Sequence, residues 1–311
     1  MSSNPTSHFV FLPNRPIVVQ ENGDTVRDKL KLHYWEWKGH QPTILFCHGV
    51  SFHGRCYDRI INEALNGYHV ISIDLRGHGR SQQHPPPYDS RWIGEDILSF
   101  IETLHLSNDH LIGIGHSFGG YALTYAALIA PRRLFQSLLL LDPGILARDL
   151  YGLGDNKIPE LTYILRRKNH WNSVDEMISR LEIRPPFKNW PKDIIRTYCT
   201  YALNENHELT CNSDIEYSIY HSTLHTNSNM YPLFEKSKFI HDIPIHIVRS
   251  SIPFVLGQFD TSPTSPELVR YLRKGRETRL DNAKHFFPME EIQLTVDLIK
   301  QILKDNFRSN L

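Results

Sequence analysis

The feature that most constrains this chain is an apolar run that ends in a glycine-flanked serine and leads directly into a helix-forming segment. Residues 111–115 are apolar and β-prone, Ser117 follows within the pattern Gly-His-Ser-Phe-Gly, and residues 121–128 favour a helix. Small residues two positions before and after the serine let a strand and a helix pass closely. The pattern therefore predicts a strand, a sharp turn with Ser117 at its apex, and a helix.

The first half of the chain alternates apolar runs with helical segments. Continuous apolar runs occupy residues 42–49, 69–77 and 137–141, and apolar side chains recur at helical spacing between Asp89 and Leu106. Residues 31–37 alternate apolar with polar side chains, as in a half-buried edge strand. Continuous apolar strands separated by helices indicate an α/β fold, with a mostly parallel central sheet flanked by helices.

The alternation stops between residues 144 and 235, which are rich in arginine, asparagine and aromatic side chains. We interpret this stretch as a mainly helical cap inserted over the carboxyl edge of the sheet, where ligands bind in open α/β folds. Regular elements resume with strands at 243–248 and 277–280, a helix that begins at Ser265–Pro266, and a terminal helix over 289–303. The predicted domains are a core of residues 1–143 and 236–311, and a cap of residues 144–235.

Composition narrows the class of protein. Lysine plus arginine and aspartate plus glutamate both number 34, so no net field favours a nucleic-acid partner. No apolar run is long enough to cross a membrane, and the N-terminus lacks the pattern of a secretory signal. The 18 histidines include no metal-binding helix motif, and the four cysteines are scattered. We expect a cytoplasmic protein with reduced thiols; the oligomeric state stays open.

Taken together, four motifs resemble those of the α/β-hydrolase superfamily with a cap domain. They are His48-Gly49-Val50-Ser51, the turn of residues 74–81, the run of residues 115–120, and His285 before the last helix. The resemblance implies that Ser117 is the nucleophile and His285 its general base. It also implies an oxyanion hole formed by the backbone amides of Val50 and Phe118. We interpret the turn of residues 74–81 as structural, with Arg76 paired locally. No metal or organic cofactor is expected.

The acid that orients the histidine has two candidates. Many superfamily members place it after the strand that follows the cap, but residues 248–253 contain no carboxylate. Asp260 lies 12 positions beyond Val248, whereas Asp142 directly follows the strand after the serine helix. Either carboxylate would hold the imidazole tautomer and stabilise the imidazolium. We favour Asp142, and expect it within about 2.6–3.2 Å of an imidazole nitrogen.

These residues predict a serine hydrolase that cleaves a carboxylic ester through an acyl-enzyme, with a small-molecule ester or related acyl compound as substrate. Carbon–carbon bond hydrolysis on the same triad is an alternative, and so is a non-catalytic ligand-binding module on a hydrolase scaffold. Cap aromatics either line an apolar pocket or pack the cap onto the core; they are Trp171, Phe187, Trp190, Tyr198, Tyr201, Tyr217 and Tyr220. The tripeptide Ser309–Leu311 resembles a degenerate peroxisomal address, which leaves the peroxisome as the alternative location.

Overall fold

A central sheet of eight strands organises the protein, whose computed structural model describes residues 4–20, 23–106 and 108–308. The strands are β1 (Thr6–Val19), β2 (Thr25–Trp37), β3 (His40–Cys47), β4 (Tyr68–Asp74), β5 (Leu111–His116), β6 (Ser137–Leu141), β7 (Ile245–Ser250) and β8 (Gly275–Leu280). Their spatial order is β1-β2-β4-β3-β5-β6-β7-β8. The pairs β1–β2 and β2–β4 are antiparallel and all the others are parallel, which confirms the predicted α/β class.

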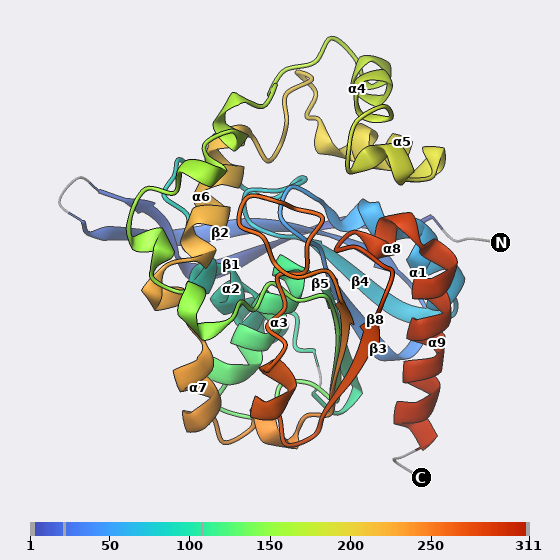
Figure 1. Cartoon of the computed structure of the whole chain (residues 1–311). Helices are drawn as coiled ribbons and strands as arrows, with labels where there is room; N and C mark the ends of the chain where they lie inside the picture. Colours follow the sequence, from blue (N-terminus) through green and yellow to red (C-terminus); the bar gives the residue numbers. More distant parts are fainter. Residues whose placement is uncertain (1–3, 21–22, 107, 309–311) are drawn as a thin grey trace.

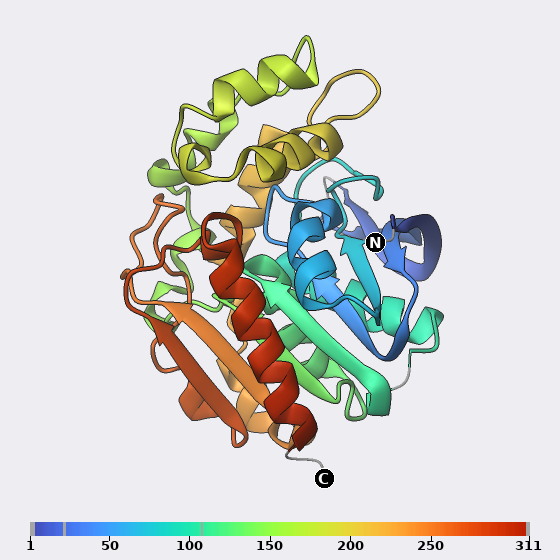
Figure 2. The ribbon, with the colours of Figure 1, turned by 90° about the vertical axis from the view of Figure 1, so that its right-hand side faces the viewer.

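Helices cover both faces of this sheet. The helices are α1 (Asp58–Ala64), α2 (Ser90–Thr103), α3 (Phe118–Ile129), α4 (Val174–Leu181), α5 (Lys192–Ala202), α6 (Ser213–Thr223), α7 (Tyr231–Lys236), α8 (Phe287–Glu290) and α9 (Ile292–Arg308). Helices α2 and α3 pack together on one face, and α1 packs against α9 on the other (Figures 1 and 2). No helix of the described part of the chain has the length and apolar character that a membrane span requires.

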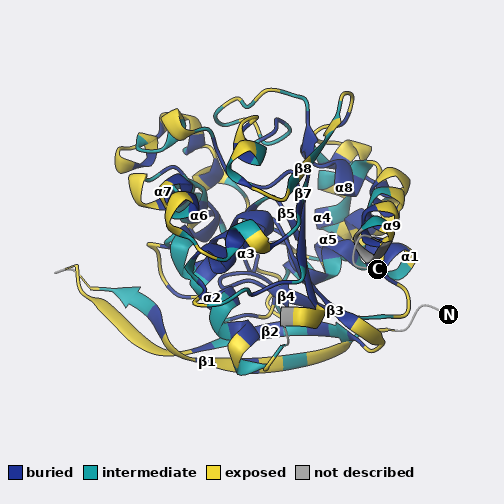
Figure 3. Cartoon of the chain, turned by 90° about the horizontal axis from the view of Figure 1, so that it is seen from below, coloured by how far each residue is buried: buried dark blue, intermediate teal, exposed yellow. Residues whose placement is uncertain are grey.

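The strand β6 shows how a continuous apolar run serves two cores. Leu138 and Leu140 belong to the apolar cluster that includes the side chains of α2 and α3, whereas Leu139 and Leu141 belong to the cluster of α1 and α9. Successive side chains of a strand point to opposite faces, so a strand covered on both sides is apolar throughout. Seen from below, the central strands form a buried layer between the two sets of helices, whereas β1 lies exposed at the edge of the sheet (Figure 3).

The edge of the sheet differs from the prediction. Residues 31–37 belong to β2, which is not an edge strand because β1 pairs with it along its outer side. Sequence patterning missed β1 because its outward side chains are also apolar: Phe9 and Phe11 are 48% and 57% exposed, whereas Val10 and Leu12, which alternate with them, are buried. Such a strand shows no clean alternation of apolar and polar positions.

Two predicted helices also differ. The segment after Ser265–Pro266 forms only a short 3₁₀ turn, η10 (Leu268–Tyr271). The amide of Ser265 donates to the carbonyl of Ile145 at 2.8 Å, which ties the start of this segment to the chain that follows β6. The terminal helix is divided into α8 and α9, and α9 continues to Arg308, beyond the predicted end at residue 303.

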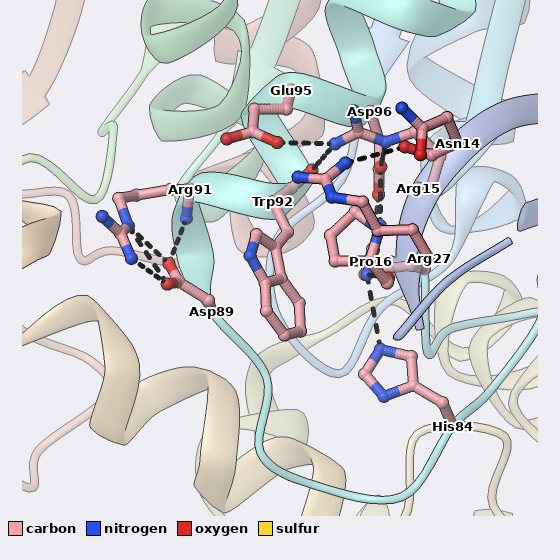
Figure 4. Close-up of polar contacts among 11 residues, drawn as sticks. Asn14, Arg15, Pro16, Arg27, His84, Asp89, Arg91, Trp92, Glu95 and Asp96 are labelled. Atoms are coloured by element: carbon pink, nitrogen blue, oxygen red, sulfur yellow. Dashed lines mark hydrogen bonds and ion pairs between the residues drawn. The ribbon is translucent and has the colours of Figure 1, made fainter. Parts of the chain in front are cut away.

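A buried ionic cluster attaches β1 to α2 and corrects the expected pairing of Arg76. Arg15 of β1 donates to Asp96 (2.7 Å) and Glu95 (2.9 Å) of α2, as Figure 4 shows. Arg76 is fully buried and donates to Asp96 (2.7 Å) and to the carbonyl of Pro16 (2.7 Å). Arg76 therefore pairs outside its own turn, because a buried guanidinium needs several acceptors that a tight turn does not supply.

Residues 144–235 contain 3₁₀ turns, the helices α4–α6 and most of α7, which ends one residue later at Lys236. In Figure 1 the helices α4 and α5 lie above the sheet, and α6 descends towards it. Residues from this stretch line a cavity together with Ser117 at the carboxyl end of β5. Helix α7 instead packs against α3, beside the sheet.

Candidate active site

Ser117 sits on a strained turn between β5 and α3. Its backbone adopts φ 53° and ψ −118°, in the region that non-glycine residues rarely occupy. A side chain at Gly119 would come within 2.2 Å of the carbonyl oxygen of Cys47, and one at Gly115 within 2.7 Å of the backbone of Gly119. Strand and helix therefore approach so closely that only glycine fits on either side of the serine.

Three side chains form a hydrogen-bonded chain at this turn. The Nε2 atom of His285 lies 2.9 Å from the Oγ of Ser117, and its Nδ1 lies 2.7 Å from the Oδ2 of Asp142. Ser117 directly follows β5 at the elbow, Asp142 directly follows the adjacent strand β6, and His285 lies just before α8. The imidazole thus bridges a hydroxyl and a carboxylate, with opposite ring nitrogens facing each, and the distance to Asp142 falls in the expected range.

Asp142 is completely buried and surrounded by donors. Its Oδ1 accepts hydrogen bonds from the hydroxyls of Ser262 (2.6 Å) and Thr264 (3.0 Å) and from the amide of Ser250 (3.3 Å). These donors satisfy the oxygen that does not face the histidine, so the carboxylate is held in one orientation. Ser262 and Thr264 lie in the long segment after β7, and sequence reasoning did not single them out.

The rival carboxylate points elsewhere. The side chain of Asp260 pairs with Lys284 at 2.9 Å, and both side chains are more than two-fifths exposed. Only its backbone carbonyl contacts the histidine, by accepting from the amide of His285 at 3.2 Å. The structure therefore brings Asp142, and not Asp260, to the imidazole ring.

His116, the residue before the serine, supports the site from beneath. It is fully buried; one ring nitrogen lies 2.7 Å from the hydroxyl of Tyr57 and the other 3.1 Å from the carbonyl of His285. Burial holds the pKa of His116 well below its usual range, so the ring is neutral and carries one proton. His116 thus connects the serine turn to the histidine loop. The sequence offered only its place within the Gly-His-Ser-Phe-Gly pattern.

Val50 and Phe118, the residues predicted to form the oxyanion hole, line the same cavity as Ser117. Phe118 is the first residue of α3, where amides have no acceptor within the helix and the helix dipole favours negative charge. Val50 lines the same cavity as Ser117 and follows Gly49, at which a side chain would come within 3.2 Å of the Cβ of Ser117. The next residue, Ser51, has φ 67° and donates its amide to the ring of His78 at 3.1 Å, which fixes this turn.

An apolar cavity of about 640 Å³, its mouth included, opens over Ser117 and His285. The helical insertion contributes Leu146, Leu161, Tyr220, Thr223 and Leu224 to its wall. The segment after β7 contributes Phe254, Leu256, Phe259 and Pro263. Tyr220 and Phe259 stack with ring centroids 4.6 Å apart, which joins the two parts of the wall. The cavity is therefore suited to an apolar group held against the serine.

Most of the predicted cap aromatics pack against the core instead of lining this cavity. Among the described residues, Tyr220 is the one member of that set in the cavity wall. Trp190 and Tyr198 pack edge-on against Phe52, with centroids 5.6 and 5.8 Å away, and Phe187 contacts both of them. The aromatic cluster thus attaches the insertion to the core, while the loop after β7 forms the wall that the sequence did not predict.

The fold and this arrangement of serine, histidine and aspartate define a class, that of α/β hydrolases with a serine at the elbow. The family model described as alpha/beta hydrolase family matches residues 44–297. The chain therefore belongs to the alpha/beta hydrolase family.

Curated relatives share parts of the sequence. The chain is 30% identical over 175 residues to the type I acyl-CoA thioesterase mpaH of Penicillium roqueforti, a match that covers 50% of this chain and 40% of the relative. It is 37% identical over 99 residues to a non-heme chloroperoxidase of Burkholderia pyrrocinia, covering 31% of this chain and 34% of the relative. The matches thus span less than half of the length of these relatives.

A solved structure is similar over nearly the whole chain. The peroxisomal alpha-beta-hydrolase Lpx1 of Saccharomyces cerevisiae superimposes with a TM-score of 0.75 at 16% identity, covering 98% of this chain and 90% of that one. At this level of identity the similarity concerns the fold.

Proposed function

We propose that the protein is a serine hydrolase that cleaves the carboxylic ester of a small molecule with an apolar acyl group. The observation that carries the proposal is the hydrogen-bonded chain from Ser117 through His285 to Asp142, at the base of an apolar cavity. A free hydroxyl is a weak nucleophile, and a histidine within hydrogen-bonding distance can take its proton.

The mechanism follows from the positions of these groups. His285 removes the proton of Ser117 as its Oγ attacks the substrate carbonyl, and Asp142 stabilises the imidazolium that forms. The amides of Val50 and Phe118 hold the negative oxygen of the tetrahedral intermediate. His285 then gives its proton to the leaving alcohol, and afterwards activates a water molecule that releases the acyl group from Ser117.

A thioester is the second candidate substrate, since the first curated relatives are described as acyl-CoA thioesterases. The same attack serves both bonds, with a thiol in place of the alcohol as leaving group. Carbon–carbon bond hydrolysis stays an alternative, and a non-catalytic binding module would leave Ser117 unreactive. p-Nitrophenyl esters of graded acyl length, acyl-CoA thioesters and diketones separate these reactions.

The test is covalent labelling combined with substitution. A fluorophosphonate probe should label Ser117, and Ser117→Ala should abolish labelling and lower turnover by about 10⁴-fold or more, because members of a triad act as a unit. The melting temperature should stay close to that of the wild type, because the substitution removes a single hydroxyl. Ordinary ester hydrolysis by the alanine variant would refute the assignment.

The location is predicted to be cytoplasmic. The tripeptide Ser309–Leu311, on which the peroxisomal alternative depends, lies outside the described residues. One protein of similar structure is described as peroxisomal, and for this reason we retain the peroxisome as the alternative location. Fluorescence microscopy of the chain carrying an N-terminal tag distinguishes the two compartments.

A further inference from the structure

A second cavity lies in the insertion, on the segment that contains α4. It measures about 870 Å³, its open side included. Five cationic side chains line it: Arg166, Arg167, Lys168, Arg180 and Arg184. Among the residues that the structure describes, no carboxylate lines it, although the whole chain carries equal numbers of acidic and basic residues. We call this feature the basic groove.

The cations of the basic groove are only partly neutralised. Arg167 pairs with the buried Glu216, and Lys168 pairs with Glu176 at 2.5 Å. Within the described parts of the chain, no ion pair or side-chain hydrogen bond is formed by Arg166, Arg180 or Arg184. By contrast, the cavity beside α1 combines Arg55 and Arg59 with Asp58, Glu63 and Asp193. The basic groove therefore presents excess positive charge that an anionic ligand would neutralise.

The floor of the basic groove is apolar. Trp171, Met177 and Leu209 line it and are each more than nine-tenths buried. The ammonium group of Lys168 lies 4.5 Å from the centre of a Trp171 ring. An apolar and aromatic floor beneath a cationic rim suits a ligand that combines a flat ring with phosphate groups. Inorganic anions would use the rim alone.

The basic groove and the cavity above Ser117 share a wall. Tyr163 lines the groove, its ring packs against Phe259 with centroids 5.8 Å apart, and its hydroxyl donates to the carbonyl of Gly257 at 3.1 Å. Phe259 and Gly257 both line the cavity above Ser117. The basic groove and the cavity above Ser117 are therefore adjacent, with Tyr163 and Phe259 between them.

We propose that the basic groove binds the phosphorylated nucleotide end of an acyl thioester, with Arg166, Arg180 and Arg184 contacting the phosphates of coenzyme A. The inference rests on the second candidate of the proposed function, hydrolysis of a thioester by Ser117, and deepens it by assigning the leaving group. The apolar acyl group occupies the cavity above Ser117, and the nucleotide remains outside it.

Direct binding tests the groove without any turnover. In calorimetry with Ser117→Ala, coenzyme A should bind, dephospho-coenzyme A should bind several-fold more weakly, and pantetheine should bind weakest. Raising the salt concentration should weaken coenzyme A binding, because exposed charges are screened. Equal binding of coenzyme A and pantetheine would overturn the proposal.

Substitutions locate the binding. Arg166→Gln and Arg184→Gln should each weaken coenzyme A binding about tenfold, the effect of one lost arginine–phosphate contact. In the enzyme with intact Ser117 they should raise the KM for an acyl-CoA, yet leave hydrolysis of the p-nitrophenyl ester of the same acid unchanged. The matched control is Arg270→Gln, an exposed arginine on η10 of the core, which should change neither.

The outcomes separate this inference from the proposed function. The proposed role of the basic groove would be refuted if the groove variants lost hydrolysis of both the acyl-CoA and the p-nitrophenyl ester, or if their coenzyme A binding did not change. Binding to phosphatidylglycerol vesicles that coenzyme A does not displace would likewise refute it, in favour of a membrane contact. Turnover that survives Ser117→Ala would refute the proposed function while the binding result still stands.

Discussion

The segment of residues 111–142 and the two segments over the cavity, 144–235 and 251–264, are built on different principles. The first consists of two adjacent parallel strands and one helix, with glycines where backbones nearly touch. The others consist of short helices, 3₁₀ turns and loops that are held by side chains distant in sequence. Ser117 and Asp142 of the proposed triad thus stand at the ends of regular strands, whereas irregular segments form much of the wall of the cavity above them.

Of the substitutions that compare these regions, the one with the largest expected effect on turnover changes Asp142, the carboxylate at the end of residues 111–142. Asp142→Asn preserves the shape of the side chain but favours the wrong imidazole tautomer, so turnover should fall about 10⁴-fold, as in serine proteases. Steady-state kinetics on a p-nitrophenyl ester measures it. The matched control is Asp260→Asn, in the irregular segment, which loses one exposed ion pair and should change turnover less than threefold. The reverse ranking of the two variants would contradict the role of Asp142.

Close packing at the elbow should appear as a large loss of stability. Gly119→Ala places a methyl group against the carbonyl of Cys47 and should lower the free energy of unfolding by about 3 kcal/mol. Gly144→Ala is the control, because its nearest contact would be an ordinary 3.6 Å and its φ is not positive. Urea denaturation compares the two variants; equal stabilities would show that the elbow tolerates a side chain.

The same contrast explains what the sequence could predict. The strand–turn–helix around Ser117, the position of Asp142 after β6 and the parallel sheet follow from local patterns and short-range spacing. The lining role of Phe254 and Phe259, and the hydroxyls that Ser262 and Thr264 give to Asp142, depend on how a long loop folds back over the sheet. No local pattern encodes such contacts. The strand β1 could not be predicted for another reason: its exposed aromatic side chains leave no alternation of apolar and polar residues.

Buried histidines next to the elbow should make stability depend on pH. Burial lowers the pKa of His53 and of His78 to about 4, and that of His48 to about 3. The folded state keeps these rings neutral while the unfolded chain takes up protons below about pH 6.5, so folding weakens as the pH falls from there to about 4. For each ring, the free energy of unfolding falls by about 1.4 kcal/mol for every unit by which the pH is lowered over most of that interval.

A substitution of His53 tests this dependence of stability on pH. Its ring also lies 3.0 Å from the carbonyl of Tyr198 in the insertion. His53→Gln should reduce the slope of unfolding free energy against pH by about 1.4 kcal/mol per unit between about pH 4.5 and 6. The slope is measured by urea denaturation at several pH values, and it is independent of any constant loss of stability. The exposed Asn206 of the insertion provides the control, Asn206→Gln, which changes no titrating group and should leave the slope unchanged. An unaltered slope in the His53 variant would contradict the buried neutral ring.

The smallest effect should come from the irregular wall. Phe259→Ala removes the ring that stacks on Tyr220 and should lower kcat/KM about tenfold for long acyl esters, with little change for acetyl esters. Phe11→Ala, on the exposed side of β1, should change neither. An equal loss for short and long esters would indicate that Phe259 supports the serine turn instead of the acyl group.

The origin of the histidine has a consequence for the growing chain. Ser117 and Asp142 follow the neighbouring strands β5 and β6, whereas His285 follows β8, the outermost strand on the far side of β7 and the last strand in the chain. In the proposed mechanism, a nascent chain that has not yet added β8 therefore carries a serine without its general base. The proposed hydrolase would gain its reactivity towards acyl compounds only when the last part of the sheet has docked.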